Sequence, residues 1–70
     1  MQLSTLEGFR EVLPPHKIQQ IEEELTELVR EGTLPSDIFR FVVIKFGDGE
    51  QVAIHIQDKE IARIKRKLLA

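Results

Sequence analysis

Apolar and polar residues between Ile38 and Ile56 are arranged as two β-strands joined by a tight turn. The turn is Gly47-Asp48-Gly49, in which Gly49 takes the positive φ of a G1 bulge. It sets the cross-strand pairs Phe46 with Glu50, Ile44 with Val52, Val42 with Ile54, and Arg40 with Ile56. A two-residue Asp48-Gly49 turn is the alternative, but it shifts the register by one residue and mixes apolar side chains with Lys45.

The predicted hairpin is apolar on both of its faces. One face is expected to be core and carries Ile38, Val42, Ile44, Phe46, Val52, Ile54 and Ile56. The opposite face carries Lys45 and Gln51 at its margin and an apolar group at its centre. We expect that group to be a dimer or partner interface, since it has too much apolar surface to leave in water. Its apolar members are Phe39, Phe41, Val43 and Ala53, and His55 beside them completes the predicted interface.

A helix is predicted from about His16 to Glu31, before the hairpin. Apolar residues recur there at a three-four spacing, at Ile18, Ile21, Leu25 and Leu28. Pro14 and Pro15 are typical of a helix start, and Gly32 is typical of a C-terminal left-handed residue. Residues 33–37 are expected to connect this helix to the hairpin.

The segment 58–69, after the hairpin, is predicted to form a C-terminal helix capped by Asp58. Ile61, Ile64 and Leu68 then share one side. A third antiparallel strand over residues 61–65 is the alternative, but Ile61 and Ile64 are three positions apart, whereas residues on one strand face are two apart.

The N-terminal residues 1–13 carry a weaker pattern. Ser4 and Glu7 match a capping box, which predicts a short helical turn, although Gly8 disfavours a helix. A docked extended arm fits equally well.

These elements give one small α+β domain over residues 1–70, in the order helix, hairpin, helix (α-β-β-α). A chain of this length has a small core, and the absence of cysteine removes disulfides as a source of stability. We therefore expect self-association, most simply as a homodimer formed through the Phe39/Phe41/Val43 face or by joining hairpin edges into one intermolecular sheet. A different protein is the alternative partner.

The overall composition fits a folded chain. Of its residues, 41% are hydrophobic and 31% are charged, with a net charge of −2. The N-terminal segment lacks the basic start and the long apolar stretch of a signal peptide, so we expect a cytoplasmic protein with no membrane contact.

Basic residues are concentrated near the C-terminus, where a phosphate or an acidic protein surface could bind. The candidate contacts are Lys59, Arg63, Lys65, Arg66 and Lys67. Residues 1–35 carry three basic and seven acidic side chains, whereas residues 36–70 carry seven basic and five acidic. The two halves should therefore attract each other. Because the whole chain is acidic, we favour a protein contact over nucleic acid for this segment.

No arrangement of residues predicts catalysis. The two histidines, His16 and His55, lack nearby ligand partners for a metal, and the glycines belong to turns and do not form a phosphate loop. We expect no cofactor, metal or small-molecule substrate. The predicted function is that of a non-enzymatic interaction or regulatory module acting as a homodimer. The alternatives are a nucleic-acid-binding dimer and an accessory subunit of a larger complex.

Overall fold

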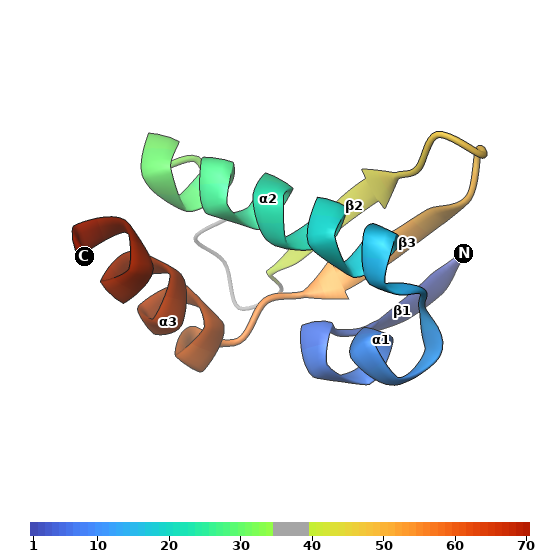
Figure 1. Ribbon diagram of the computed structural model, residues 1–70, viewed down its shortest axis with the longest axis horizontal. Coiled ribbons are helices and arrows are strands. Elements are labelled where there is room, and N and C mark those ends of the chain that lie inside the picture. The colour runs from blue at the N-terminus through green and yellow to red at the C-terminus, as the bar shows by residue number, and fades with distance from the viewer. Residues whose placement is uncertain (35–39) are drawn as a thin grey trace.

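The computed structural model describes residues 1–34 and 40–70 and has a mixed α/β fold (Figure 1). Its elements follow one another as β1 (Gln2–Thr5), α1 (Leu6–Val12), α2 (Pro15–Glu31), β2 (Phe41–Lys45), β3 (Gln51–His55) and α3 (Asp58–Leu69). The described strands form one sheet in the order β1-β3-β2. The predicted connection at residues 35–37, together with Ile38 and Phe39, lies outside the described residues.

The hairpin between β2 and β3 has the predicted register. Val42 lies opposite Ile54, and Ile44 lies opposite Val52. The Phe46 N–H donates to the Glu50 carbonyl over 2.8 Å, which closes the three-residue turn. Gly49 has a φ of 91°, as a G1 bulge requires. The alternative two-residue turn is therefore wrong.

The sheet has a third strand that the predicted α-β-β-α order lacks. β1 pairs in parallel with β3, with Leu3 opposite Ala53 and Thr5 opposite His55. The N-terminal segment thus contains both of the structures considered for it, an extended arm and then a helix. The predicted capping box at Ser4 is wrong, since Thr5 is the N-cap and its Oγ1 accepts a hydrogen bond from the Gly8 N–H over 3.1 Å.

The helix α2 follows the prediction closely. Pro14 is its N-cap and Pro15 its first residue, where the missing N–H leaves no hydrogen bond unmade. Gly32 ends the helix with a φ of 70°, and its N–H donates to the carbonyls of the last turn. Ile21 and Leu25 are fully buried, so the predicted apolar stripe faces the core.

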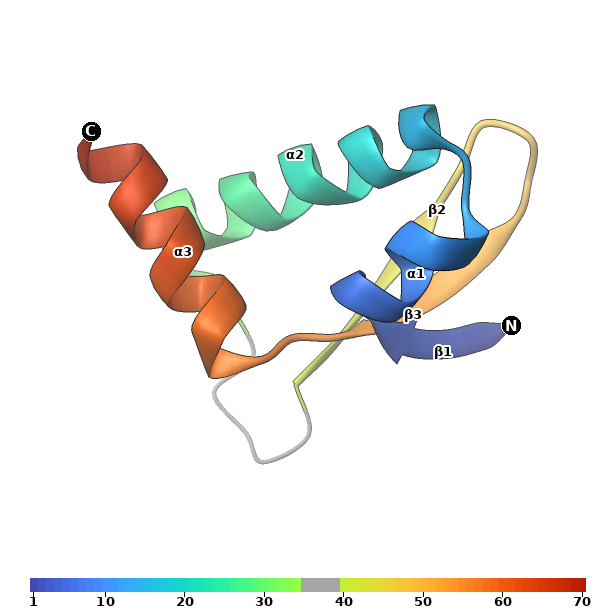
Figure 2. The same ribbon diagram turned by 60° about the horizontal axis from the view of Figure 1, so that its bottom comes forward.

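The C-terminal segment is the helix α3, so the alternative of a third antiparallel strand there is wrong. Its N-cap is Gln57 and not Asp58, and the cap has no side-chain hydrogen bond. Ile64 is fully buried against the core, whereas Leu69 is 87% exposed. α3 lies beyond the end of β3 and beside the C-terminal half of α2, as both views show (Figures 1 and 2).

The core lies between one face of the sheet and the helices (Figure 2). Its fully buried side chains are Leu6, Phe9, Ile21, Leu25, Ile44, Val52, Ile54 and Ile64. They come from all three helices and from β2 and β3. Each such side chain stabilises the fold by about 1.5–3 kcal/mol through the removal of apolar surface from water. Because the helices gather on this side, the other face of the sheet is left open.

Candidate interaction surface

The sheet face away from the helices carries a group of apolar side chains from all three strands. We call this group, together with the neighbouring His55, the open face and define it as Leu3, Phe41, Val43, Ala53 and His55. Strand register places Leu3, Ala53 and Val43 in one row across the sheet, with His55 and Phe41 in the next row. Leu3 is 61% exposed, Val43 55% and Phe41 38%. Three large apolar side chains therefore stand together in water.

Phe41 and His55 form a ring contact on this surface. They are a directly opposed cross-strand pair, and their ring centroids lie 5.2 Å apart with the planes inclined at 39°. The distance is within the usual range for ring pairs, and such pairs help to fix side chains across a sheet. His55 is half-buried in this contact, whereas Phe41 remains exposed.

Four of the five residues predicted for the interface lie on the open face. Phe41 and Val43 are exposed, and Ala53 and His55 are half-buried. The fifth, Phe39, lies outside the described residues. Sequence reasoning missed Leu3, because β1 was not expected to join the sheet. The only available signal was a single apolar residue between polar neighbours in QLST.

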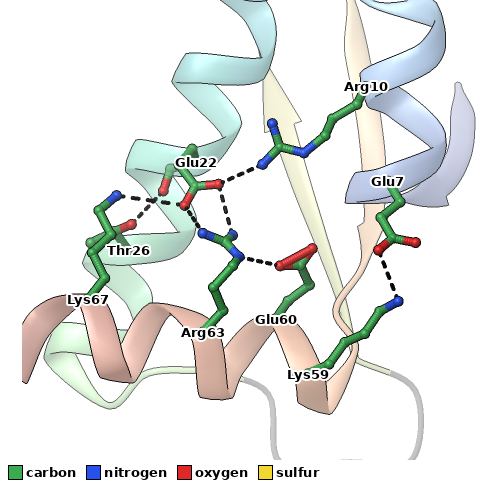
Figure 3. Close-up of polar contacts among 8 residues, drawn as sticks. All are labelled: Glu7, Arg10, Glu22, Thr26, Lys59, Glu60, Arg63 and Lys67. Carbon is green, nitrogen blue, oxygen red and sulfur yellow. Dashed lines mark hydrogen bonds and ion pairs between the residues drawn. The ribbon is translucent and has the colours of Figure 1, made fainter.

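The predicted basic contacts on α3 fall into two groups. Lys59 pairs with Glu7 over 3.0 Å, and Arg63 and Lys67 turn toward Glu22 on α2 (Figure 3). Lys65 and Arg66 are exposed, and within the described part of the chain no acidic side chain pairs with either. These pairs between the two halves of the chain confirm the predicted attraction. They also mean that three of the five predicted basic contacts already have acidic partners.

Glu22 is the centre of an ion-pair cluster that joins three helices (Figure 3). Arg63 donates to both of its carboxylate oxygens, over 2.8 and 2.9 Å, and Arg10 donates to it from α1 over 3.3 Å. Arg63 also donates to Glu60 over 2.7 Å. The hydrogen bonds from Arg63 hold the pKa of Glu22 below its ordinary value, and the bonds to Glu22 raise that of Arg63.

The cluster borders a shallow hollow lined by Arg10, Leu13, Ile18, Glu22, Arg63 and Lys67. A carboxylate with a lowered pKa is a weak proton acceptor near neutrality, so Glu22 is suited to holding the helices together and not to general-base chemistry. The sequence pattern did not single out Glu22, so this cluster was not predicted.

A second polar group stands at the hairpin tip. The Lys17 ammonium lies 2.8 Å from Asp48 and 2.7 Å from Glu50, and 4.9 Å from the centroid of the Phe46 ring. The hydrogen bond from Lys17 lowers the pKa of Asp48, and the same bond raises the pKa of Lys17. This group ties the start of α2 to the turn.

Among the described residues, no group of His, Asp and Glu side chains is arranged to hold a metal ion. His16 is exposed in the first turn of α2, far along the chain from His55 on β3. In residues 1–34 and 40–70 there is also no helix with the length and apolarity needed to cross a membrane.

Comparison of the chain with family models, with curated proteins and with solved structures finds no match in any of the three.

Proposed function

We propose that this chain is a small binding module that works as a homodimer, in which the open faces of two copies cover each other. The observation that carries the proposal is the exposure of Leu3 on β1 and of Phe41 and Val43 on β2, on one sheet face with only the small Ala53 and the half-buried His55 of β3 between them. Sheets that pack face to face bury such side chains in a layer about 10 Å thick. A second copy supplies a surface of the same size and apolar character.

The area of the open face predicts a weak dimer. Three strands about 4.8 Å apart, with about five residues each at 3.3 Å, give a face of roughly 240 Å² in projection. A standard stable interface buries about 800 Å² of accessible surface on each partner. We therefore expect a dissociation constant in the micromolar range, at about 1–100 μM.

Nucleic-acid binding through α3 is a weaker proposal. Lys59, Arg63 and Lys67 already have acidic partners within the chain, which leaves Lys65 and Arg66 as exposed cations. Two phosphate contacts for each copy supply little affinity at physiological salt.

Sedimentation of the purified chain over a range of concentrations tests the dimer. We expect the apparent mass to rise from one copy toward two, with little dependence on salt because the contact is apolar. Phe41→Asp places a charge in the contact, so we expect a folded monomer at every concentration. Leu69→Asp is the matched control, since Leu69 is also an exposed apolar residue but lies at the end of α3.

Two results would count against the proposal. One is a wild-type chain that stays monomeric at several hundred micromolar, well above the expected dissociation constant. The other is an equal loss of dimer in Phe41→Asp and Leu69→Asp. Global unfolding of Phe41→Asp would show that Phe41 belongs to the core of its own chain. The milder Val43→Thr then tests the same face without a buried charge.

A further inference from the structure

The strand β2 has one edge that no other described strand covers, because it is the outermost strand in the order β1-β3-β2. In an antiparallel pair, successive residues direct their backbone groups alternately to the partner strand and away from it. The Phe46 N–H donates to Glu50, and the Arg40 carbonyl accepts from the Ile56 N–H, each over 2.8 Å. The residues between them at odd positions therefore direct their N–H and C=O groups outward.

The outward groups belong to Phe41, Val43 and Lys45. The Lys45 carbonyl accepts a hydrogen bond from the Gln20 side chain over 3.2 Å, which confirms the outward direction and closes that end of the edge. Within residues 1–34 and 40–70, no hydrogen bond reaches the outward groups of Phe41 or Val43. A segment of open strand edge remains there.

A groove runs between this edge and α2. Its apolar lining comes from Leu28, Val42 and Val43, and its other wall is acidic, with Glu23, Glu24 and Glu27. Arg30 pairs with Glu27. Among the described residues, Glu23 and Glu24 accept hydrogen bonds only from the neutral side chains of Gln19 and Gln20, over 3.3 and 2.9 Å. The wall therefore keeps a net negative charge beside the open edge.

We propose that β2 binds an extended segment of another protein as an added strand, and that this segment alternates basic and apolar residues. Side chains of an added strand point alternately to the two sides of the sheet. Those on the α2 side meet Glu23 and Glu24, which favours lysine or arginine. Those on the other side lie beside Phe41 and Val43 and extend the open face, which favours apolar residues.

The same acidic wall argues against pairing between two β2 edges of this protein. Antiparallel pairing of two such edges has a two-fold axis perpendicular to the sheet, so α2 of both copies lies on the same face. Glu23, Glu24 and Glu27 of each copy then approach their own counterparts, and like charges at close approach are unfavourable. Charge beside an exposed edge is also a common protection against self-pairing. We therefore expect the added strand to come from a different protein and not from a second copy of this chain. The proposal does not depend on the homodimer, since two copies packed through their open faces leave the β2 edges free.

A titration followed by amide resonances of the full chain tests the proposal. The probe is a peptide of about eight alternating lysine and valine residues, near the usual strand length, and its counterpart has glutamate in place of lysine. We expect slowed amide exchange at Phe41 and Val43 with the lysine peptide and none with the glutamate peptide. Slowed exchange along β1 instead, or equal binding of both peptides, overturns the proposal.

Two substitutions that change the charge by the same amount show where on the chain the peptide binds. Glu24→Lys reverses a charge on the groove wall, and we expect about fivefold weaker peptide binding, the upper range for an exposed charge pair. Glu31→Lys makes the same change on α2 outside the groove, and we expect less than a twofold effect. Equal weakening by both substitutions would indicate attraction to the acidic chain as a whole, and would overturn the proposal.

A third substitution removes the backbone donor. Val43→Pro eliminates the outward N–H, and proline is tolerated in edge strands where the N–H faces solvent. We expect loss of peptide binding with the β2–β3 amide resonances retained. Undiminished binding by a folded Val43→Pro chain would overturn the strand pairing. If this variant unfolds, the comparison of Glu24→Lys with Glu31→Lys still tests whether the peptide binds beside β2.

Discussion

Arg63 on α3 donates hydrogen bonds to Glu22 on α2 from both terminal guanidinium nitrogens, each within 2.9 Å of a different carboxylate oxygen. This two-pronged geometry matches the guanidinium plane to the carboxylate, and lysine cannot reproduce it. The Glu22 side chain is only 17% exposed, so water screens the pair less than it screens an ordinary surface contact. This ion pair joins two helices, α2 and α3, that are distant in sequence.

Replacing Arg63 by lysine should therefore destabilise the fold. Lysine keeps the charge but loses the paired hydrogen bonds to Glu22 and the bond to Glu60. We expect the free energy of unfolding to fall by about 1.5–3 kcal/mol, the usual range for hydrogen bonds to charged groups. Thermal unfolding measures it, with a loss of roughly 4–8 °C for each kcal/mol. Arg66→Lys is the control, because Arg66 is exposed on the same helix.

The ion pair also predicts how stability depends on pH. The pKa of Glu22 is lowered in the folded chain because Arg63 donates hydrogen bonds to its carboxylate. A lowered folded pKa gives stability that is complete above the unfolded pKa and is lost as pH falls through the folded pKa.

Between about pH 5 and pH 2, the wild type should accordingly lose more stability than Glu22→Gln, which has no proton to gain there. Urea unfolding at several pH values measures this difference. Asp48, whose pKa is also lowered, is present in both chains and does not contribute to the difference. Parallel pH profiles for the two chains would contradict the assignment to Glu22.

The hairpin turn offers a test that is independent of charge. Gly49 has a φ of 91°, which L side chains rarely adopt, although no atom would obstruct a Cβ there. Gly49→Ala should therefore destabilise the fold by about 1–2 kcal/mol through backbone strain alone. Gly47 has equal space and no positive φ, so Gly47→Ala should cost much less. Denaturant unfolding of the two variants compares them directly, and equal losses would contradict this explanation.

The parts of the fold that sequence could predict are those set by local patterns. The turn residue Gly49 fixed the hairpin register, and the spacing of Ile18, Ile21 and Leu25 located α2. By contrast, β1 has four residues and one strongly apolar side chain, and its partner residues on β3 lie 50 positions further along the chain, as Gln2 and Val52 do. Nothing in a segment so short indicates a parallel neighbour so distant.

The candidate site likewise has features that the sequence could predict and features that it could not. The contact between Phe41 and His55 follows from the hairpin register, so it was predictable. Leu3 joins the open face only through β1 and was therefore missed. The cluster around Glu22 depends on how α1, α2 and α3 pack, and a run of glutamates on a helix surface does not reveal which of them meets an arginine.

The parallel pairing of β1 with β3 has a consequence for the order of assembly. Gln2 meets Val52, so the central strand gains its second neighbour only after the hairpin residues have been synthesised. Such distant contacts slow folding, because a long loop must close before they form. Until that loop closes, the backbone N–H and C=O groups on one edge of β3 have no partner strand in a nascent chain. During translation, such an unpaired strand edge is open to mispairing with other polypeptides.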